Sequence, residues 1–280
     1  MFITTRHRRS VAVAAGSAAV LILTAGCTSS GNDGKDNGSA TAGAGVPLVA
    51  EGKLTTCTHL PYPPFQFEQD GEVVGFDVSL IDLVADELGV KQEIIDTPFE
   101  NFKTGAFLNA GKCDLAAAGI TITEDRKKNV DFSDPYFEAT QAVLATKKSG
   151  ITSLDDVRAK NKKIGAQAQT TGEEYAQSKG FDPVSFESSD AVINGLRTGQ
   201  IDAVVIDYPV VQGWLKDKAN SQQFQLAGNL ETGEQYGIMV KKGNSKLRSA
   251  INKVLGEAKA DGNYKSIYEK WIGPLPQDQS

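Results

Sequence analysis

Three polar groups just beyond predicted strands have the chemistry needed to hold a small zwitterion. Arg126 follows the segment 119–123, and its guanidinium can bind a carboxylate bidentately with charge-assisted hydrogen bonds. Residues 170–172 open a predicted helix, whose first backbone N–H groups also favour an anion. Asp207 ends an apolar strand, 203–206, where its carboxylate can receive an ammonium group. Their joint placement predicts a site for a ligand that carries both charges.

Each of these polar residues also has a plainer explanation. Thr121 and Thr171 can be ordinary turn or N-cap residues. Arg126 can pair on the surface with a neighbouring carboxylate, Glu124 or Asp125. Taken singly, most of the residues fit the plainer explanation, and only their common position at strand ends favours a site.

Aromatic residues near other strand ends can wall the rest of such a pocket. Tyr62, Phe65 and Phe99 have this placement, and their rings would pack along a ligand side chain. The alternative for Tyr62 and Phe65 is an ordinary place in the core.

The residues that catalysis would need are scarce. The sequence has only two histidines, His7 and His59, which excludes a multi-histidine metal site and leaves a serine or cysteine nucleophile only His59 as a conventional base. It contains no phosphate-binding glycine loop, no dinucleotide fingerprint and no Gly-x-Ser-x-Gly elbow. We therefore predict no catalytic residues, no metal and no cofactor.

Alternating strands and helices must position these side chains. Strands are expected at 54–58, 91–95, 115–118, 162–167 and 203–206, with helices at 76–88, 172–179, 191–198 and within 244–272. This order is typical of βαβ units with largely parallel sheets. The segment 111–116 resembles 199–204, because in each a helix ends at glycine and an Asp opens an apolar strand. Two α/β lobes are therefore expected, and their facing strand ends would form a cleft.

Six motifs stand together in an order typical of one protein family. They are His59-Leu60-Pro61-Tyr62-Pro63-Pro64-Phe65, Gly75-Phe76-Asp77-Val78, Gly119-Ile120-Thr121-Ile122-Thr123-Glu124-Asp125-Arg126, Asp131-Phe132-Ser133-Asp134-Pro135-Tyr136, Thr170-Thr171-Gly172-Glu173-Glu174-Tyr175 and Tyr236-Gly237-Ile238. Over about 53–273 the chain resembles the polar amino-acid-binding proteins of ABC importers, the solute-binding family 3. The resemblance implies a two-lobed periplasmic-binding-protein type II fold, with a mostly parallel sheet flanked by helices in each lobe. It further implies a monomer that closes on a free polar L-amino acid and delivers it to an ABC permease.

The resemblance also implies roles for individual residues. Arg126, assisted by Thr121 and the backbone at Thr171, would bind the ligand carboxylate, while Asp207, the Gly119 carbonyl and the Thr121 hydroxyl would bind the ammonium group. The expected side-chain contacts are Tyr62, Phe99, Gln167 and His59.

His59 is a departure from the family pattern. Relatives for basic amino acids or glutamine commonly have Asp at this place. An imidazole there weakens the case for a strongly basic ligand, although Glu100 lies beside Phe99. The choice among glutamine, glutamate, arginine and other polar amino acids therefore stays open.

The first residues of the chain read as an export signal. A basic start, 6–9, precedes an uncharged run, 11–26, that is shorter than the ~20 apolar residues of a membrane span. The run ends in Leu23-Thr24-Ala25-Gly26-Cys27, which resembles the lipobox of bacterial lipoproteins. Cys27 would become the lipidated first residue, the alternative being a cleaved signal without lipid. Both Sec and twin-arginine export stay open.

This start sets the expected organisation of the 280-residue chain. We expect a signal peptide over 1–26, a lipidated cysteine and flexible tether over 27–49, a first lobe from 50–140 and 235–280, and a second lobe from 141–234. The hinges would lie near 138–143 and 232–237. The protein would be extracytoplasmic and anchored to the cell membrane through lipid on Cys27. The net charge of −6 argues against a nucleic-acid partner.

Two cysteines remain after Cys27. An even count in an exported protein favours a disulfide between Cys57 and Cys113, the alternative being two separate buried thiols.

Three functions fit these observations. The first is a lipid-anchored receptor of an amino-acid importer, the second is a sensory amino-acid-binding lipoprotein, and the third is a dehydratase-like enzyme on the same fold.

Overall fold

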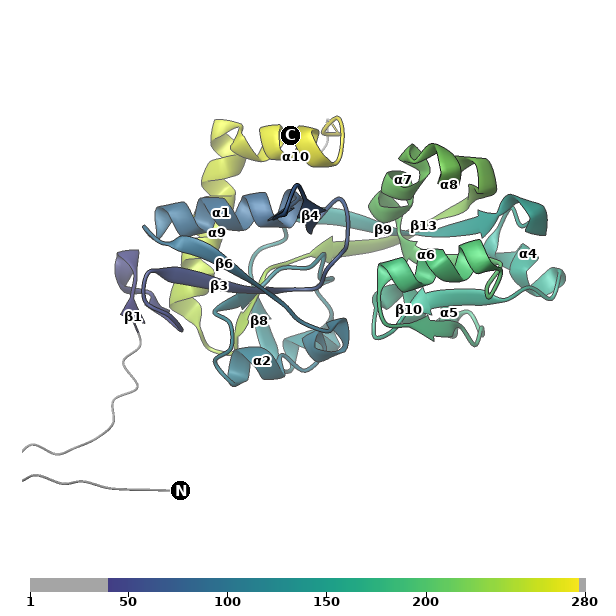
Figure 1. Cartoon of the computed structure of the whole chain (residues 1–280). Coiled ribbons are helices and arrows are strands. Elements are labelled where there is room, and N and C mark those ends of the chain that lie inside the picture. Colours follow the sequence, from purple (N-terminus) through teal and green to yellow (C-terminus); the bar gives the residue numbers. More distant parts are fainter. Residues whose placement is uncertain (1–39, 277–280) are drawn as a thin grey trace, which may run out of the picture. The chain divides into compact units, whose positions relative to one another are not determined.

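Two five-stranded sheets organise the part of the chain that the structure describes, residues 40–276 of a computed structural model (Figure 1). The predicted signal peptide, Cys27 and the start of the tether lie outside the described residues. The first sheet has the order β6 (Lys91–Asp96), β3 (Lys53–Thr58), β7 (Leu115–Ala116), β14 (Met239–Lys241) and β8 (Val130–Phe132). The second has the order β11 (Val184–Phe186), β10 (Ile164–Gln167), β12 (Ala203–Asp207), β9 (Phe137–Thr146) and β13 (Phe224–Tyr236). Each sheet with its helices is called a lobe below.

Strand pairing follows the same plan in both sheets. β3 pairs in parallel with β6 and β7, as β10 does with β11 and β12. The remaining strands run antiparallel, β14 to β7 and β8, and β9 to β12 and β13. The α/β class with mostly parallel sheets is therefore confirmed, because four of the five strands in each sheet share one direction and only β14 or β9 runs against them. The opposed strands are β9, which carries the chain into the second lobe, and β14, which follows its return to the first.

Helices flank both sheets. The first lobe contains α1 (Phe76–Glu87), α2 (Ala106–Asn109), α3 (Glu124–Lys127), α9 (Ser245–Asp261) and α10 (Asn263–Trp271). The second contains α4 (Leu154–Ala159), α5 (Thr171–Ser178), α6 (Ser189–Thr198), α7 (Tyr208–Lys216) and α8 (Lys218–Gln223). Short elements complete the list: β1 (Ala40–Thr41), β2 (Pro47–Leu48), β4 (Phe67–Gln69), β5 (Glu72–Val74), and the 3-10 helices Gly43–Gly45, Phe99–Phe102 and Lys147–Ser149.

The internal repeat seen in the sequence holds in space. Gly111 and Gly199 have positive φ, 67° and 77°, and follow α2 and α6, respectively. β7 and β12 come next, and each lies between a parallel and an antiparallel neighbour. The two strands thus hold equivalent places in their sheets.

An aromatic cluster packs α1 and α10 against the start of β9. The ring centroid of Phe76 lies 5.6 Å from that of Phe137 and 5.7 Å from that of Tyr268. Phe137 in turn stacks on Tyr236, the last residue of β13, at 5.4 Å. Both strands that run between the lobes are therefore fixed by ring packing at their first-lobe ends.

The two predicted hinge segments, near 138–143 and 232–237, coincide with parts of β9 and β13. Phe137 pairs with Tyr236 and Ala139 with Glu234, after which the register is irregular between Leu230 and Glu234. Such a bulge bends a strand and leaves residues without ladder partners.

Part of the stretch predicted to be tether is packed against the first lobe. The expected tether runs to residue 49, yet β1 pairs with β2, and Val46 and Leu48 are buried against the first lobe. These two buried side chains, together with hydrogen bonds from the backbone N–H groups of Gly43 to the Leu88 carbonyl and of Val49 to Asp114, dock a stretch whose glycine-rich surroundings predict a flexible chain.

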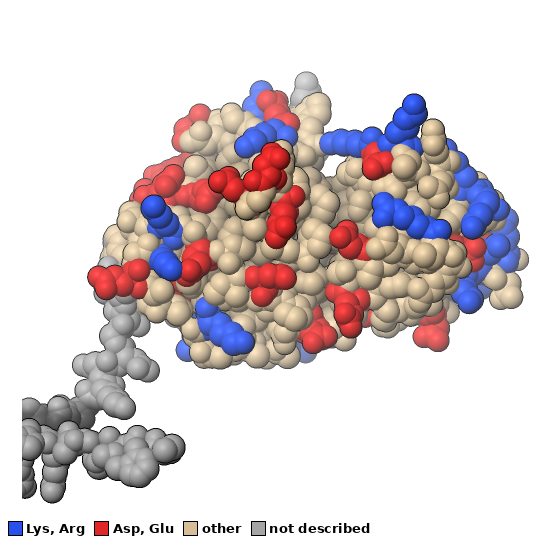
Figure 2. All heavy atoms as spheres, in the orientation of Figure 1, with Lys and Arg blue, Asp and Glu red and all other residues tan. Residues whose placement is uncertain are grey.

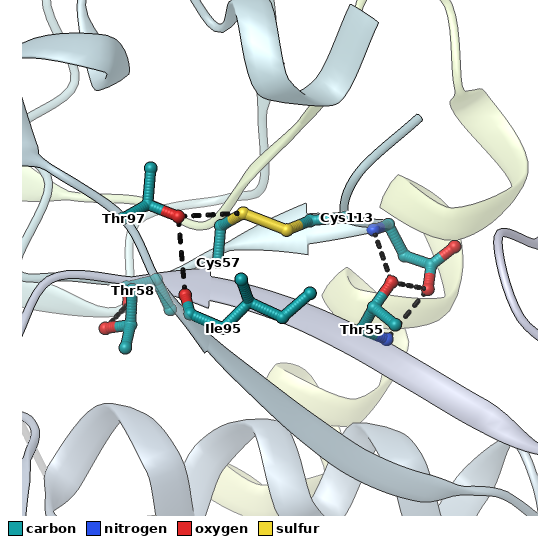
Figure 3. Close-up of a disulfide and its surroundings, with 8 residues drawn as sticks. Thr55, Cys57, Thr58, Ile95, Thr97 and Cys113 are labelled. Carbon is teal, nitrogen blue, oxygen red and sulfur yellow. Dashed lines mark hydrogen bonds between the residues drawn. A yellow bond between two sulfur atoms is a disulfide. The ribbon is translucent and has the colours of Figure 1, made fainter. Parts of the chain in front are cut away.

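Cys57 and Cys113 form the predicted disulfide, with Cα atoms 5.7 Å apart (Figure 3). Cys57 lies on β3, and Cys113 lies two residues before β7 begins at Leu115. The Thr97 hydroxyl points at the Cys57 sulfur at 3.4 Å, and Asp114 accepts hydrogen bonds from the backbone N–H and hydroxyl of Thr55. The bridge is thus enclosed in the first lobe.

Surface charge differs between the lobes on the face that Figure 2 draws. Acidic side chains gather over the first lobe near α1, which exposes Asp82, Asp86 and Glu87. Basic side chains gather over the outer end of the second lobe, where α4 and the turn after it expose Arg158 and Lys160. No helix within residues 40–276 is long and apolar enough to cross a membrane.

Candidate functional site

A pocket between the lobes gathers eight of the nine predicted ligand-binding residues. Its lining consists of Tyr62, Phe99, Ala118, Gly119, Thr121, Arg126, Gln167, Thr170, Thr171 and Asp207. The first six come from the first lobe and the last four from the second. The exception is His59, which is not among the described residues that line the pocket.

Arg126 lies on α3, whose N-cap Thr123 accepts a hydrogen bond from the Arg126 backbone N–H at 3.2 Å. Its side chain points inward and is only 4% exposed. The guanidinium donates to the Thr121 carbonyl at 2.8 Å and to the Gln169 carbonyl at 3.3 Å. It also lies over the Phe99 ring, 5.7 Å from the centroid. Carbonyls and a ring face hold this side chain in place without neutralising it.

The plainer explanation for Arg126, a surface ion pair, does not hold. Glu124 pairs with Lys127 at 2.9 Å and Asp125 with Lys128 at 2.6 Å. Among the residues that the structure describes, no carboxylate lies within ion-pairing distance of Arg126. Burial lowers the pKa of Arg126, against the opposing influence of Glu174, Glu234 and Asp207. A buried, unpaired guanidinium is costly, so this pocket is suited to an anionic group brought by a ligand.

Asp207 faces the same pocket from the end of β12 and is 7% exposed. One oxygen accepts the Tyr62 hydroxyl at 2.5 Å and the Tyr236 hydroxyl, and the other accepts Nε2 of Gln141. Burial, followed by the nearby charge of Glu234, raises the pKa of Asp207 to about 6, although its three hydrogen bonds act in the opposite direction. A ligand ammonium group would favour the charged carboxylate.

Gly119 brings its backbone close to two aromatic rings. At φ +59° it has the left-handed conformation, and a Cβ would lie 3.2 Å from Tyr62 Cε1 and 3.4 Å from Tyr236 Cε2. Its N–H donates to Asp77 at 2.8 Å, and Asp77 also accepts the Tyr136 hydroxyl at 2.8 Å. Burial raises the pKa of Asp77 to about 7. Asp77 thus fixes the peptide unit that borders the pocket.

The second lobe adds the start of α5 and the end of β10. Thr171 is the first residue of α5, and the N-cap is Thr170, whose hydroxyl accepts the Glu173 N–H at 3.2 Å. Thr171 is therefore not the cap that the plainer explanation assigned to it. Gln167 is 2% exposed, and its Nε2 has no hydrogen-bond partner among the described residues. This amide offers the pocket a donor.

His59 and Phe65 lie behind the pocket wall. Nδ1 of His59 is 3.1 Å from the Thr97 carbonyl, which can only accept, so this nitrogen carries the proton. The His59 ring lies 6.0 Å from that of Phe99, and its Nε2 has no partner in the described chain. Phe65 belongs to the core, where it packs edge-on against Phe137, as its plainer explanation holds.

Gln141 and Glu234 are site residues that sequence reasoning missed. Nε2 of Gln141 donates to Asp207 and, at 3.1 Å, to Glu234. Glu234 also accepts the hydroxyls of Thr171 at 2.9 Å and Thr121 at 3.1 Å. A buried amide within the apolar β9 was a usable signal for Gln141, but nothing in the local sequence marks Glu234.

Further contacts join the lobes beside the pocket. Lys103 pairs with Glu174 at 3.2 Å, and the Ser189 hydroxyl donates to the Pro61 carbonyl at 2.8 Å. The lobes are therefore in contact on more than one side of the pocket. No group of three or more metal-ligating side chains occurs within residues 40–276.

Comparison with known proteins identifies the family. The bacterial extracellular solute-binding proteins, family 3, match residues 54–274. The chain belongs to this family. It is accordingly a binding protein and not an enzyme, and the predicted resemblance is confirmed.

Several named relatives and solved structures align with most of this chain. It is 34% identical over 250 residues to a probable histidine-binding protein of Neisseria gonorrhoeae, covering 86% of this chain and 89% of the relative. It is 32% identical over 262 residues to the glutamine-binding protein GlnH of a Bacillus subtilis ABC transporter, covering 92% and 95%. An ancestral arginine-binding protein solved with arginine is 42% identical, with a TM-score of 0.73, covering 80% of this chain and 99% of that one. An ancestral arginine-binding protein solved with glutamine is also 42% identical, at a TM-score of 0.74.

Proposed function

We propose that this solute-binding protein binds a free polar L-amino acid in the pocket between its lobes and delivers it to the permease of an ABC importer. Arg126 binds the ligand carboxylate and Asp207 the ammonium group. Tyr62 and Phe99 flank the ligand side chain, with Gln167 toward its end and His59 supporting Phe99 from behind. The relatives that carry arginine, glutamine or histidine in their names support a polar amino acid as the ligand class.

One observation carries this proposal. Arg126 and Asp207 are buried, carry opposite charges and line one pocket from different lobes, and neither has an ion-pair partner among the described residues. A zwitterion neutralises both at once, which a simple cation or anion does not. Because it touches both lobes together, it also stabilises the closed arrangement through differential affinity.

The proposal also includes the lobe boundaries, the hinge and the membrane anchor. The lobes divide at 140/141 and 234/235, and they close about the β9 and β13 crossing. Lipid on Cys27 holds the exported protein at the membrane, close to the permease. A sensory role for the same amino-acid-binding lipoprotein is the second candidate, and a neighbouring permease and ATPase gene pair would favour transport.

Calorimetric titration with the twenty L-amino acids tests the proposal. We expect saturable binding of at least one polar amino acid, and loss of that binding in Asp207→Ala with retention of the folded state. Asp190→Ala, which removes an exposed carboxylate from α6 in the same lobe, is the matched control and should bind normally. Unchanged affinity in Asp207→Ala would remove Asp207 from the site.

A further inference from the structure

Glu234 brings together donors from both lobes on one carboxylate oxygen. Its Oε2 accepts the hydroxyl of Thr121 from the first lobe at 3.1 Å and the hydroxyl of Thr171 from the second at 2.9 Å. Nε2 of Gln141, on β9, donates to the same oxygen at 3.1 Å. No cation lies within ion-pairing distance of Glu234 among the described residues. The carboxylate therefore serves these three donors and not a salt bridge.

This arrangement determines whether the hydroxyls of Thr121 and Thr171 donate or accept hydrogen bonds. A threonine hydroxyl has one proton and two lone pairs, and a carboxylate can only accept. The two hydroxyls also lie 3.3 Å from each other, but the carboxylate is the nearer and the charged acceptor for both. Each therefore gives its proton to Glu234 and keeps only lone pairs for other partners. Thr121 and Thr171 both line the ligand pocket, so their hydroxyl oxygens are available there as acceptors.

Gln141 likewise acts as a donor, toward Asp207 as well as Glu234. The Gln141 side chain is fully buried, and its Nε2 donates to Asp207 as well as to Glu234. The same nitrogen lies farther from the Thr171 hydroxyl, at 3.4 Å, so its two protons go to the nearer carboxylates, and Asp207 is held at the pocket wall. Around this part of the pocket the chain offers acceptors and no free side-chain donor from Thr121, Thr171 or Gln141.

We propose that Glu234 is a positioning residue that sets the Thr121 hydroxyl as an acceptor and so makes the site require an α-ammonium group on its ligand. The inference rests on the proposed amino-acid-binding function. It assigns to Glu234, acting through Thr121 and beside Asp207, a share in the discrimination between an amino acid and the same acid without its amino group. Arg126, which would hold the carboxylate common to both ligands, has no part in this discrimination.

The test compares two ligand pairs in Glu234→Gln and the wild type by calorimetry at one pH. The pairs are L-glutamine with 4-carbamoylbutanoate and L-arginine with 5-guanidinopentanoate, in which the second compound lacks only the α-amino group. The amide that this substitution introduces can donate to Thr121 and reverse the hydroxyl, and hydrogen bonds to charged groups are the stronger ones. We expect the amino acid to lose about tenfold or more in affinity, corresponding to about 1.4 kcal/mol, while the deamino acid changes less than about threefold.

Matched variants separate this role from a general loss of structure. Glu231→Gln makes the same change on β13 at an exposed residue and should leave both affinities unchanged. Glu234→Asp keeps the carboxylate and should restore part of the preference for the amino acid. Equal loss for both members of a pair, or no loss for either, would overturn the role of Glu234 while leaving amino-acid binding intact. Failure of the wild type to bind either amino acid would overturn both this inference and the proposed function for these ligands.

Discussion

The two lobes solve one packing problem in different ways. Register places Cys57 opposite Ala116 in the first sheet and Gly165 opposite Val204 in the second, and the internal repeat aligns Cys113 with Ile201. The first lobe joins its two positions by a disulfide. In the second, Ile201 Cδ1 lies 2.7 Å from where a Gly165 Cβ would be. A covalent bond in one lobe thus corresponds to an isoleucine packed over a glycine in the other.

Element length explains the difference. In the first lobe β7 has 2 residues and α2 has 4, whereas their counterparts β12 and α6 have 5 and 10. Short elements bury less apolar surface and form fewer ladder hydrogen bonds, so packing alone stabilises them less. The disulfide is therefore located in the lobe whose copy of the internal repeat has the shorter strand and the shorter helix.

Removing the crosslink should produce the largest effect. Cys57 and Cys113 are separated by 56 residues, for which the chain-entropy model gives a loss of about 4 kcal/mol in Cys57→Ala/Cys113→Ala. Urea unfolding of the oxidised wild type and the double variant measures this difference. The wild type in reductant is the control and should lose a similar amount. A loss below about 1 kcal/mol would mean that the first lobe does not depend on its bridge.

A larger residue at the matching position of the second lobe, Gly165, should lower the free energy of unfolding by less than loss of the disulfide does. In Gly165→Ala the new methyl would meet Ile201 Cδ1 at 2.7 Å and Phe186 Cε2 at 2.9 Å, and overpacking of this kind costs about 1–3 kcal/mol. Ile201→Val removes the Cδ1 methyl, so we expect it to recover part of the loss in the Gly165→Ala background. Simple additivity of the two substitutions in urea unfolding would argue against direct packing of Ile201 over Gly165.

The smallest expected effect is a pH dependence of the free energy of unfolding. It should differ between the buried carboxyls of the two lobes, Asp77 and Asp207. Burial raises the pKa of Asp77 to about 7 and that of Asp207 to about 6, both above the ordinary value of 3.8. The folded state therefore binds their protons more tightly than the unfolded state, and the stability gained below about pH 4 is lost as pH rises through 6–7. Between pH 6 and 7 each carboxyl should remove about 1 kcal/mol or less, Asp77 more than Asp207.

The measurement is the free energy of unfolding of ligand-free protein at pH 6 and 7. Asp77→Asn should flatten this dependence more than Asp207→Asn. A bound amino acid should abolish the Asp207 part, because its ammonium group favours the charged carboxylate, so affinity should rise over the same interval. An identical pH dependence in the wild type and Asp77→Asn would contradict the assignment.

Sequence periodicity and turn chemistry predicted most elements to within a few residues. The strand expected at 54–58 is β3 (Lys53–Thr58), and the helix expected at 76–88 is α1 (Phe76–Glu87). These segments have apolar spacing and terminal glycines that act locally. The ordered stretch at 40–48 was not foreseen, because its docking depends on two side chains whose partners lie elsewhere in the first lobe.

The site was predictable where its residues belong to recognisable motifs. Arg126 and Asp207 were singled out by type and position, and the structure brings them to one pocket. Glu234 was not, because its role depends on hydroxyls 113 and 63 positions away in sequence. The ligand-binding roles of all these residues stay predictions until binding is measured.

The enclosed Cys57–Cys113 bridge has a consequence for when the protein matures. Cysteines remain thiols in the reducing cytosol and pair only after a chain reaches an oxidising compartment. Newly made chains of this family member would therefore lack part of their final stability before export and acquire it afterwards. The bridge therefore links the timing of folding to the compartment in which the protein works.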